Sequence, residues 1–330
     1  MLEALRSHWI LAILLAGGWA LSGTPLAAKD AATRRPIDEL KPIATIRVGK
    51  TADWVAVTPD AVWVGSTGPD AVHRIDPKTN ALVASVTLNG EPCAGLSAGL
   101  GSLWVPLCGS EPTLAKVDLA SNALTGVFKI GPPVGEGGVA VSADSVWLVT
   151  DKNGTLARID PATGAVRQSI RVPAGSYNPT YRDGDIWVSR ADGSEVTRVD
   201  AKTGAVLASV RTGPGPRFLT SGAGAIWTLN QGDGSLTRVD VETKKSKTIA
   251  LDTPGHGGDV AFGGDMIWTT MMKAPLSMID AATVTLRCQW TGAGGDSLST
   301  GHGSIWLTDY HGGTISRIDM SDAMSRCRNR

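Results

Sequence analysis

Hydrophobic and polar residues alternate in short runs along most of this chain, and the runs recur. One unit has such runs at 139–142, 145–150, 155–160 and 165–172, separated by turn residues. A period of two is typical of half-buried β-strands. Four short strands within about 40 residues, the length of one propeller blade, therefore predict one small antiparallel sheet.

A tryptophan after an aliphatic residue marks the second strand of every unit. The intervals between these tryptophans are 41, 43, 40, 40, 41 and 38 residues, which suits a four-stranded propeller blade. We predict an all-β fold, a seven-bladed β-propeller of four-stranded blades over residues 43–330, with these side chains between the blades. The seven residues are Trp63, Trp104, Trp147, Trp187, Trp227, Trp268 and Trp306.

The two ends of the propeller are expected to meet. Residues 43–49 have the alternation of a strand but precede the first complete unit. Pairing this strand with the last unit would close the ring and protect its open edges. The tail from residue 321 would then be displaced or add an edge strand.

A second repeated motif, such as Arg158-Ile159-Asp160, follows each tryptophan by 11 to 13 residues. Its Asp is expected to open a turn by accepting a local N–H bond, and to pair with the Arg two residues earlier, rather than to bind calcium. Four residues after the Asp, the turn favours a residue that tolerates positive φ. Asn80, Asn122, Gly164 and Gly204 satisfy this requirement, whereas Lys244, Val284 and Ala323 do not, so the later turns are expected to differ.

The first 28 residues resemble an export signal. Arg6 and His8 precede an apolar run at 9–21, and small residues follow at Ala27 and Ala28. The run is shorter than the roughly 20 residues that span a bilayer, so we expect cleavage near Ala28 and no stable membrane insertion. Residues 29–42 are predicted to be a flexible leader, and the mature protein is predicted to be periplasmic or secreted.

Composition and charge narrow the function classes. Hydrophobic residues make up 42% of the chain and charged residues 19%, which excludes disorder over most of its length. Basic and acidic residues both number 31, so no excess of positive charge is available for a nucleic-acid backbone. We expect a monomer with no nucleic-acid partner.

The four cysteines are expected to form disulfides, as is usual in an exported chain. Cys93 and Cys108 are equally distant from the centre of a hairpin turn at 99–101 and should face each other. Cys288 and Cys327 lie in adjacent units. A bridge between them requires the closing strand to displace the C-terminal tail, and the sequence leaves this open.

Candidate binding residues lie in the loops that a propeller gathers around its axis. Aligned on the tryptophans, these positions vary while the framework repeats. A rim of such polar groups predicts binding of a polar ligand, and the alternative is a solvated rim. The candidates are Asp53, Tyr177, Asn178, Arg190, Arg217, Asn230, Asp296 and Asp309. His256 and His311, with Asp296 and Asp309, are the weaker candidates for a general base and a metal site.

The units "VWVGSTGPDAVHRIDPKTNALVASVTLNGEP" and "VWLVTDKNGTLARIDPATGAVRQSIRV" resemble those of exported YVTN-type and streptogramin B lyase-like seven-bladed propellers. In the lyases, the resemblance would imply a magnesium ion and a catalytic His on the axial face. Here Gly294-Gly295-Asp296 stands where the His-bearing motif would fall, and Asp309 stands where a Glu would fall.

These observations favour an exported binding or scaffold protein. Its axial loop face would recognise a small polar molecule, a peptide or a partner protein, and such a protein requires no cofactor. The alternative is a lyase or hydrolase of the streptogramin B lyase type with a divergent magnesium site at Asp296 and Asp309.

Overall fold

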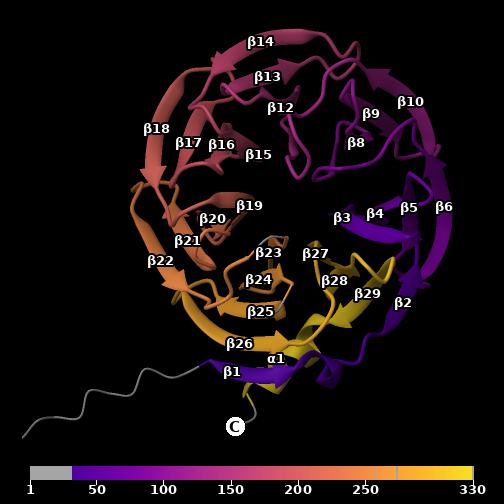
Figure 1. Cartoon of the computed structure of the whole chain (residues 1–330), viewed down its shortest axis with the longest axis vertical. Helices are drawn as coiled ribbons and strands as arrows, with labels where there is room; N and C mark the ends of the chain where they lie inside the picture. The colour runs from indigo at the N-terminus through magenta and orange to yellow at the C-terminus, as the bar shows by residue number, and fades with distance from the viewer. Residues whose placement is uncertain (1–31, 256, 273, 329–330) are drawn as a thin grey trace, which may run out of the picture. The chain divides into compact units, whose positions relative to one another are not determined.

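Seven antiparallel sheets form a ring in the computed structural model, which describes residues 32–255, 257–272 and 274–328 (Figure 1). Within a blade, successive strands run from the axis to the rim (Figure 1). The prediction of a seven-bladed β-propeller is confirmed. The predicted signal at 1–28 lies outside the described residues. No helix in the described ranges has the length and hydrophobicity needed to cross a membrane.

Five blades consist of four consecutive strands each. Blade 1 contains β3 (Thr51–Val57), β4 (Val62–Thr67), β5 (Ala71–Asp76) and β6 (Ala81–Thr87), and blade 2 contains β7 (Ser97–Gly99), β8 (Ser102–Leu107), β9 (Thr113–Asp118) and β10 (Ala123–Phe128). Blade 3 contains β11 (Val139–Val141), β12 (Val146–Asp151), β13 (Thr155–Ile159) and β14 (Val166–Arg171). Blade 4 contains β15 (Ser176–Arg182), β16 (Asp185–Arg190), β17 (Glu195–Asp200) and β18 (Val206–Arg211), and blade 5 contains β19 (Pro216–Gly222), β20 (Ala225–Asn230), β21 (Ser235–Asp240) and β22 (Ser246–Ala250).

The last two blades include strands from the N-terminal region. Blade 7 contains β27 (Leu298–Gly301), β28 (Ser304–Asp309) and β29 (Thr314–Asp319), and β2 (Ala44–Arg47) pairs with β29 as its fourth strand. Blade 6 contains β23 (Asp259–Gly263), β24 (Met266–Met271), β25 (Ala274–Asp280) and β26 (Thr285–Thr291), and β1 (Thr33–Pro36) adds a fifth, parallel strand beside β26. The predicted closing strand at 43–49 is therefore confirmed.

The structure differs from expectation at both ends of the propeller. The expected flexible leader contains β1 and the 3-10 helix η1 (Ile37–Glu39), and Leu40 is buried against blades 6 and 7. The C-terminal tail is displaced from the sheet, as the first of the two alternatives predicts, and it forms helix α1 (Met320–Arg328) rather than an edge strand. The Asp319 carboxylate accepts the Asp322 N–H at 2.8 Å and so caps the N-terminus of the helix.

The repeated tryptophans form the interblade core, as predicted. All seven are at most 1% exposed. In five blades, a Lys or Arg of the third strand lies 5.2–6.0 Å from the centre of the indole ring. Some of these cations also bridge to the next blade, for example Lys116, which donates to the Pro161 carbonyl at 2.8 Å. In these five blades the basic residue of the motif thus covers its tryptophan, and contacts such as that of Lys116 also join neighbouring sheets.

The turns after the third strands are more uniform than the sequence predicts. Lys244 and Val284 adopt φ of 61° and 55°, as Gly164 and Gly204 do at 73° and 77°. Left-handed backbone costs a non-glycine residue roughly 1–2 kcal/mol. The turn bonds outweigh this cost, since the Val284 N–H donates to the Asp280 carbonyl at 2.9 Å. The expectation that these two turns differ is wrong.

The motif carboxylates form turns, but few pair as expected. Asp160 accepts the N–H groups of Ala162 and Thr163 at 2.8 and 2.9 Å. Among the ion pairs of the described residues, only Arg238–Asp240 joins an Arg to the Asp two positions later. Arg158 instead pairs with Asp144, which lies in the turn before the second strand.

Two disulfides are present. Cys93 and Cys108 are bonded across the blade 2 hairpin with their Cα atoms 5.6 Å apart, which confirms the predicted pair. Cys288 of β26 is bonded to Cys327 of α1 with a Cα separation of 5.9 Å, so the bridge that the sequence left open is formed. The second bridge attaches the C-terminal helix to blade 6.

Replacing both Cys93 and Cys108 with serine is expected to lower the free energy of unfolding by roughly 3 kcal/mol, the entropic contribution of a loop of this length. Denaturant unfolding of the variant and the wild type would measure the loss. Because Cys288–Cys327 stays intact in both proteins, it serves as the internal control. Equal stabilities would contradict a structural role for the first bridge.

Candidate functional site

The axial loops enclose a cavity of about 350 Å³ on the face opposite the repeated Asp turns, and we call it the axial pocket. Residues from blades 1, 2, 6 and 7 and from the connections between blades line it. Its lining combines acidic, apolar and aromatic side chains. The lining includes Asp53, Glu91, Glu136 and Asp296 together with Trp54, Pro92, Met272, Tyr310 and His311.

Trp54 forms the floor of the axial pocket. It also lines a second cavity of about 230 Å³ that continues along the axis, so its side chain separates the two spaces. The indole is 5% exposed, and its ring centre lies 6.1 Å from that of Phe218, which belongs to blade 5. Trp54 has φ of 57°, and the Asp53 carboxylate accepts its N–H at 2.7 Å. A strained backbone therefore directs this ring across the axis.

Burial alters the protonation of three carboxyl groups near the axis. Burial raises the pKa of Asp53 well above its usual range, and the negative charge of Asp296 raises it further. Burial also raises the pKa of Asp296, and the charge of Glu136 adds to the effect. Below the floor, burial raises the pKa of Asp259 to about 7, although this side chain accepts bonds from the Val260 N–H and the Ser297 hydroxyl. Removal from water disfavours the charged form in each case.

The loop between blades 2 and 3 brings Glu136 to the pocket. Glu136 has φ of 62°, and its N–H donates to the Cys93 carbonyl at 2.6 Å, beside the blade 2 disulfide. The Glu136 carboxylate pairs with Arg217, and the Tyr177 hydroxyl donates to the Gly135 carbonyl. Contacts from blades 2, 4 and 5 thus hold this loop over the axis.

The structure brings together five of the eight candidate binding residues and His311, the candidate general base. Asp53, Asp296 and His311 line the axial pocket. Tyr177, Asn178 and Arg217 support its neighbouring wall. The Arg217 guanidinium lies 4.7 Å from the Tyr177 ring centre, and the Asn178 amide donates to the Arg217 carbonyl at 2.8 Å.

Three candidates lie elsewhere. Arg190 pairs with Glu195 of its own blade and donates to the Ala174 carbonyl. Asn230 is fully buried, and its amide donates to the hydroxyls of Ser235 and Thr237, so it belongs to the core of blade 5. Asp309 lines a separate cavity between blades 6 and 7 and accepts the Gly312 N–H at 3.0 Å.

The predicted metal pair is therefore divided between two cavities, with Asp296 in one and Asp309 in the other. Within residues 32–255, 257–272 and 274–328, no group of three or more His, Cys, Asp or Glu side chains is arranged to hold a metal ion. His311 is exposed at the pocket mouth. His256 lies outside the described residues.

Sequence reasoning missed Glu136, Asp259, Trp54, Tyr310 and Met272 as site residues. A weak signal existed for two of them, because Glu136 and Asp259 each stand one position from the aligned loop position that holds Asp53 and Asp296. The orientation of Trp54 has no sequence signal, since a tryptophan with positive φ is not predicted from residue type.

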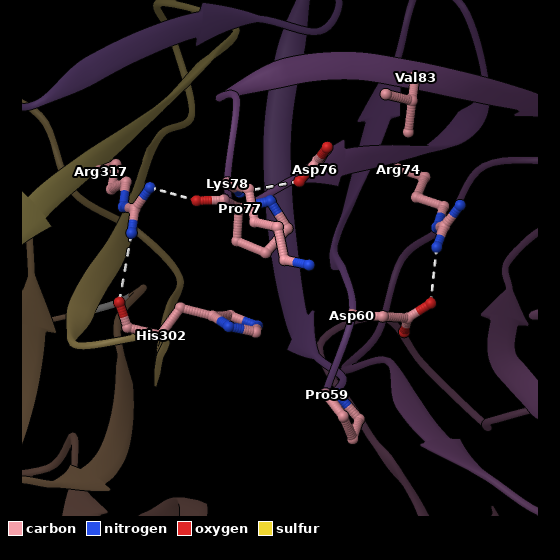
Figure 2. Close-up of a pocket in the computed structure, with 9 residues that line it drawn as sticks. All are labelled: Pro59, Asp60, Arg74, Asp76, Pro77, Lys78, Val83, His302 and Arg317. Carbon is pink, nitrogen blue, oxygen red and sulfur yellow. Dashed lines mark hydrogen bonds and ion pairs between the residues drawn. The ribbon is translucent and has the colours of Figure 1, made fainter.

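A larger cavity, of about 480 Å³, lies on the opposite face between blades 7 and 1 (Figure 2). Most of its charged side chains form hydrogen bonds within the groove. Arg74 pairs with Asp60 at 2.7 Å, and Arg317 donates to the carbonyls of Pro77 and His302 (Figure 2). These contacts join the two blades, so we assign this groove a structural role.

A closed ring of seven sheets defines a β-propeller. Its variable loops surround the axial pocket, which Trp54 closes at the bottom, and such loops are available for recognition. A family model described as "Outer membrane protein assembly factor BamB" matches residues 70–261, more than half of the chain, and the protein therefore belongs to this family.

Two solved structures resemble the propeller. BamB from Moraxella catarrhalis has a TM-score of 0.61 at 13% sequence identity, with 85% of this chain and 100% of that chain covered. A streptogramin B lyase has a TM-score of 0.67 at 16% identity, with 83% and 96% covered. At these identities the likeness shows the fold alone. A search of curated protein sequences finds no match.

Proposed function

We propose that this protein is an exported binding or scaffold propeller that recognises a small polar ligand, a peptide or a partner protein at its axial loop face. The axial pocket is the observation that carries the proposal. Convergent polar groups in a concavity on a rigid scaffold are the usual mark of a binding site. Buried Trp54 and the tethered Glu136 loop preorganise this pocket.

The compartment and the family are consistent with this role. Two disulfides are typical of a protein that matures in an oxidising environment, such as the periplasm or the extracellular space. The family description, an outer membrane protein assembly factor, favours a partner protein among the three ligand classes.

The geometry gives the lyase alternative little support, because Asp296 and Asp309 line different cavities. Millimolar magnesium is therefore expected to leave the thermal midpoint of the protein unchanged. A ligand that binds the native state raises the midpoint by mass action. A clear rise with magnesium, lost in Asp296→Asn, would favour a lyase-type site over plain binding.

The binding proposal predicts that, in the cell, a partner contacts the axial loop face of the propeller and not the opposite face. A photo-crosslinking residue at Met272, which lines the axial pocket, is expected to form a defined adduct. The matched control is Leu100, in a hairpin turn on the opposite face, because Met272 and Leu100 are 48% and 40% exposed. Mass spectrometry would identify the adducts. Equal labelling from both positions, or from neither, would contradict the proposal.

A further inference from the structure

We propose that the axial pocket receives the guanidinium group of an arginine side chain presented by a partner polypeptide. This inference rests on the proposed function and names the group that the pocket recognises.

The pocket has more carboxyl groups than cationic side chains among its described residues. Glu136 is paired with Arg217, whereas Asp53, Glu91 and Asp296 have no ion pair among the described residues. No Lys or Arg occurs among the described lining residues, and His311 at the mouth is the one basic side chain there. Burial raises the pKa of Asp53 and Asp296, so a cation that enters would stabilise the charged forms of these carboxyl groups. In a partly desolvated site this attraction exceeds that at an open surface.

The neighbouring wall provides an independent indication of which cation fits. There the chain itself places a guanidinium between a carboxylate and an aromatic ring, because Arg217 pairs with Glu136 and lies over Tyr177. Carboxylates and an aromatic ring also occur together in the axial pocket, where Tyr310 accompanies Asp53 and Asp296. Burial raises the pKa of Tyr310, and the charges of Asp53, Glu91 and Asp296 raise it further. The axial pocket thus has the same kinds of groups that hold Arg217, a carboxyl group and an aromatic ring, but no arginine among its described lining residues.

The shape of the pocket favours a side chain over a free ion. Met272 is 48% exposed and offers an apolar wall to the methylene groups of an arginine. Trp54 also lines the second cavity along the axis and lies at the bottom of the axial pocket, and the volume of about 350 Å³ can hold a side chain. A guanidinium is planar, stacks on aromatic faces and donates to two acceptors at once, whereas an ammonium is a compact, strongly hydrated charge.

The test is a titration of the full mature chain with N-acetyl-L-arginine amide, followed by NMR at the backbone amides. Shifts are expected at Asp53, Tyr310 and the loop around Glu136. Asp296→Asn is expected to weaken binding roughly tenfold, the loss associated with a hydrogen bond to a charged group. Asp309→Asn makes the same chemical change outside the pocket and is expected to leave binding unchanged.

Four results would overturn the inference. Equal binding of the capped citrulline analogue would exclude a charge requirement, and equal or tighter binding of capped lysine would exclude guanidinium selectivity. An equal loss in Asp309→Asn would exclude the axial pocket. If Asp296→Asn does not fold, Glu91→Gln replaces it. Should capped arginine fail to bind while Met272 still cross-links, the arginine inference fails and the proposed function stands.

Discussion

Replacing Trp54 with alanine is expected to lower the free energy of unfolding by roughly 3–5 kcal/mol, the range for truncating a buried aromatic side chain. The indole is 5% exposed and packs in a cluster with Phe218, Leu229 and Val260, which belong to blades 5 and 6. Its removal deletes the contact that joins blade 1 to the opposite side of the ring. Urea unfolding would measure the loss, and a structure of the variant should have one continuous axial cavity.

Trp54→Phe is the matched control, because it keeps a ring beside Phe218 and is expected to cost less than the alanine variant. Both replacements leave a non-glycine residue at the positive φ, so the difference between them reports packing rather than backbone strain. If the alanine variant lost less than about 1 kcal/mol, the indole would not be the structural floor of the pocket.

The second large effect concerns Asp259. Its pKa in the folded protein is about 7, above the value of 3.8 for an unperturbed carboxyl. The folded state therefore binds the proton more tightly than the unfolded chain does. Stability is expected to fall as the pH rises from about 4 to about 7, and to remain at the lower value above pH 7.

Asp259→Asn removes this charge and is expected to stabilise the protein at pH 8 by up to roughly 4 kcal/mol, the free energy equivalent of the pKa difference. Asparagine retains an oxygen for the Val260 N–H, which donates at 2.8 Å in the wild type. The gain should vanish near pH 4. Denaturant unfolding at several pH values would measure it.

Asp265→Asn provides the control for Asp259→Asn, because Asp265 is exposed in a turn of the same blade. It should change stability by a few tenths of a kcal/mol at any pH, as surface substitutions usually do. A wild-type protein whose stability is constant between pH 4 and pH 8 would contradict burial of an ionisable Asp259.

Most of the architecture could be predicted because its signals are local. The strands of blade 3 begin and end within one residue of the runs of alternating polarity, and the tryptophan spacing predicts the number of blades. The disulfide between Cys93 and Cys108 also follows from the symmetry of one hairpin. Helix α1 was not predicted because Asp319 accepts the N–H three residues later, as Asp160 and Asp280 do in turns, so the motif does not distinguish a helix from a turn.

The candidate site was only partly predictable. Loop alignment identified Asp53 and Asp296, but it also selected Asn230, which blade 5 buries completely. Alignment places a residue near the axis without determining whether its polar atoms meet the pocket or neighbouring hydroxyls. Glu136 was not predicted as a site residue because the loop between blades 2 and 3 has no counterpart of the same length in the other blades.

The amino-acid sequence by itself determined the repeat, the strands, the closure by residues 43–49 and the tryptophan core, since each depends on periodicity along the chain or on neighbouring residues. Only the tertiary structure decided that Asp53, Glu136 and Asp296 share one pocket above Trp54, and that Asp309 does not. The physical reason is that desolvation and electrostatic interaction depend on distances between groups in space. The groups belong to loops more than 80 residues apart in the sequence, and they come close together only once the ring has closed.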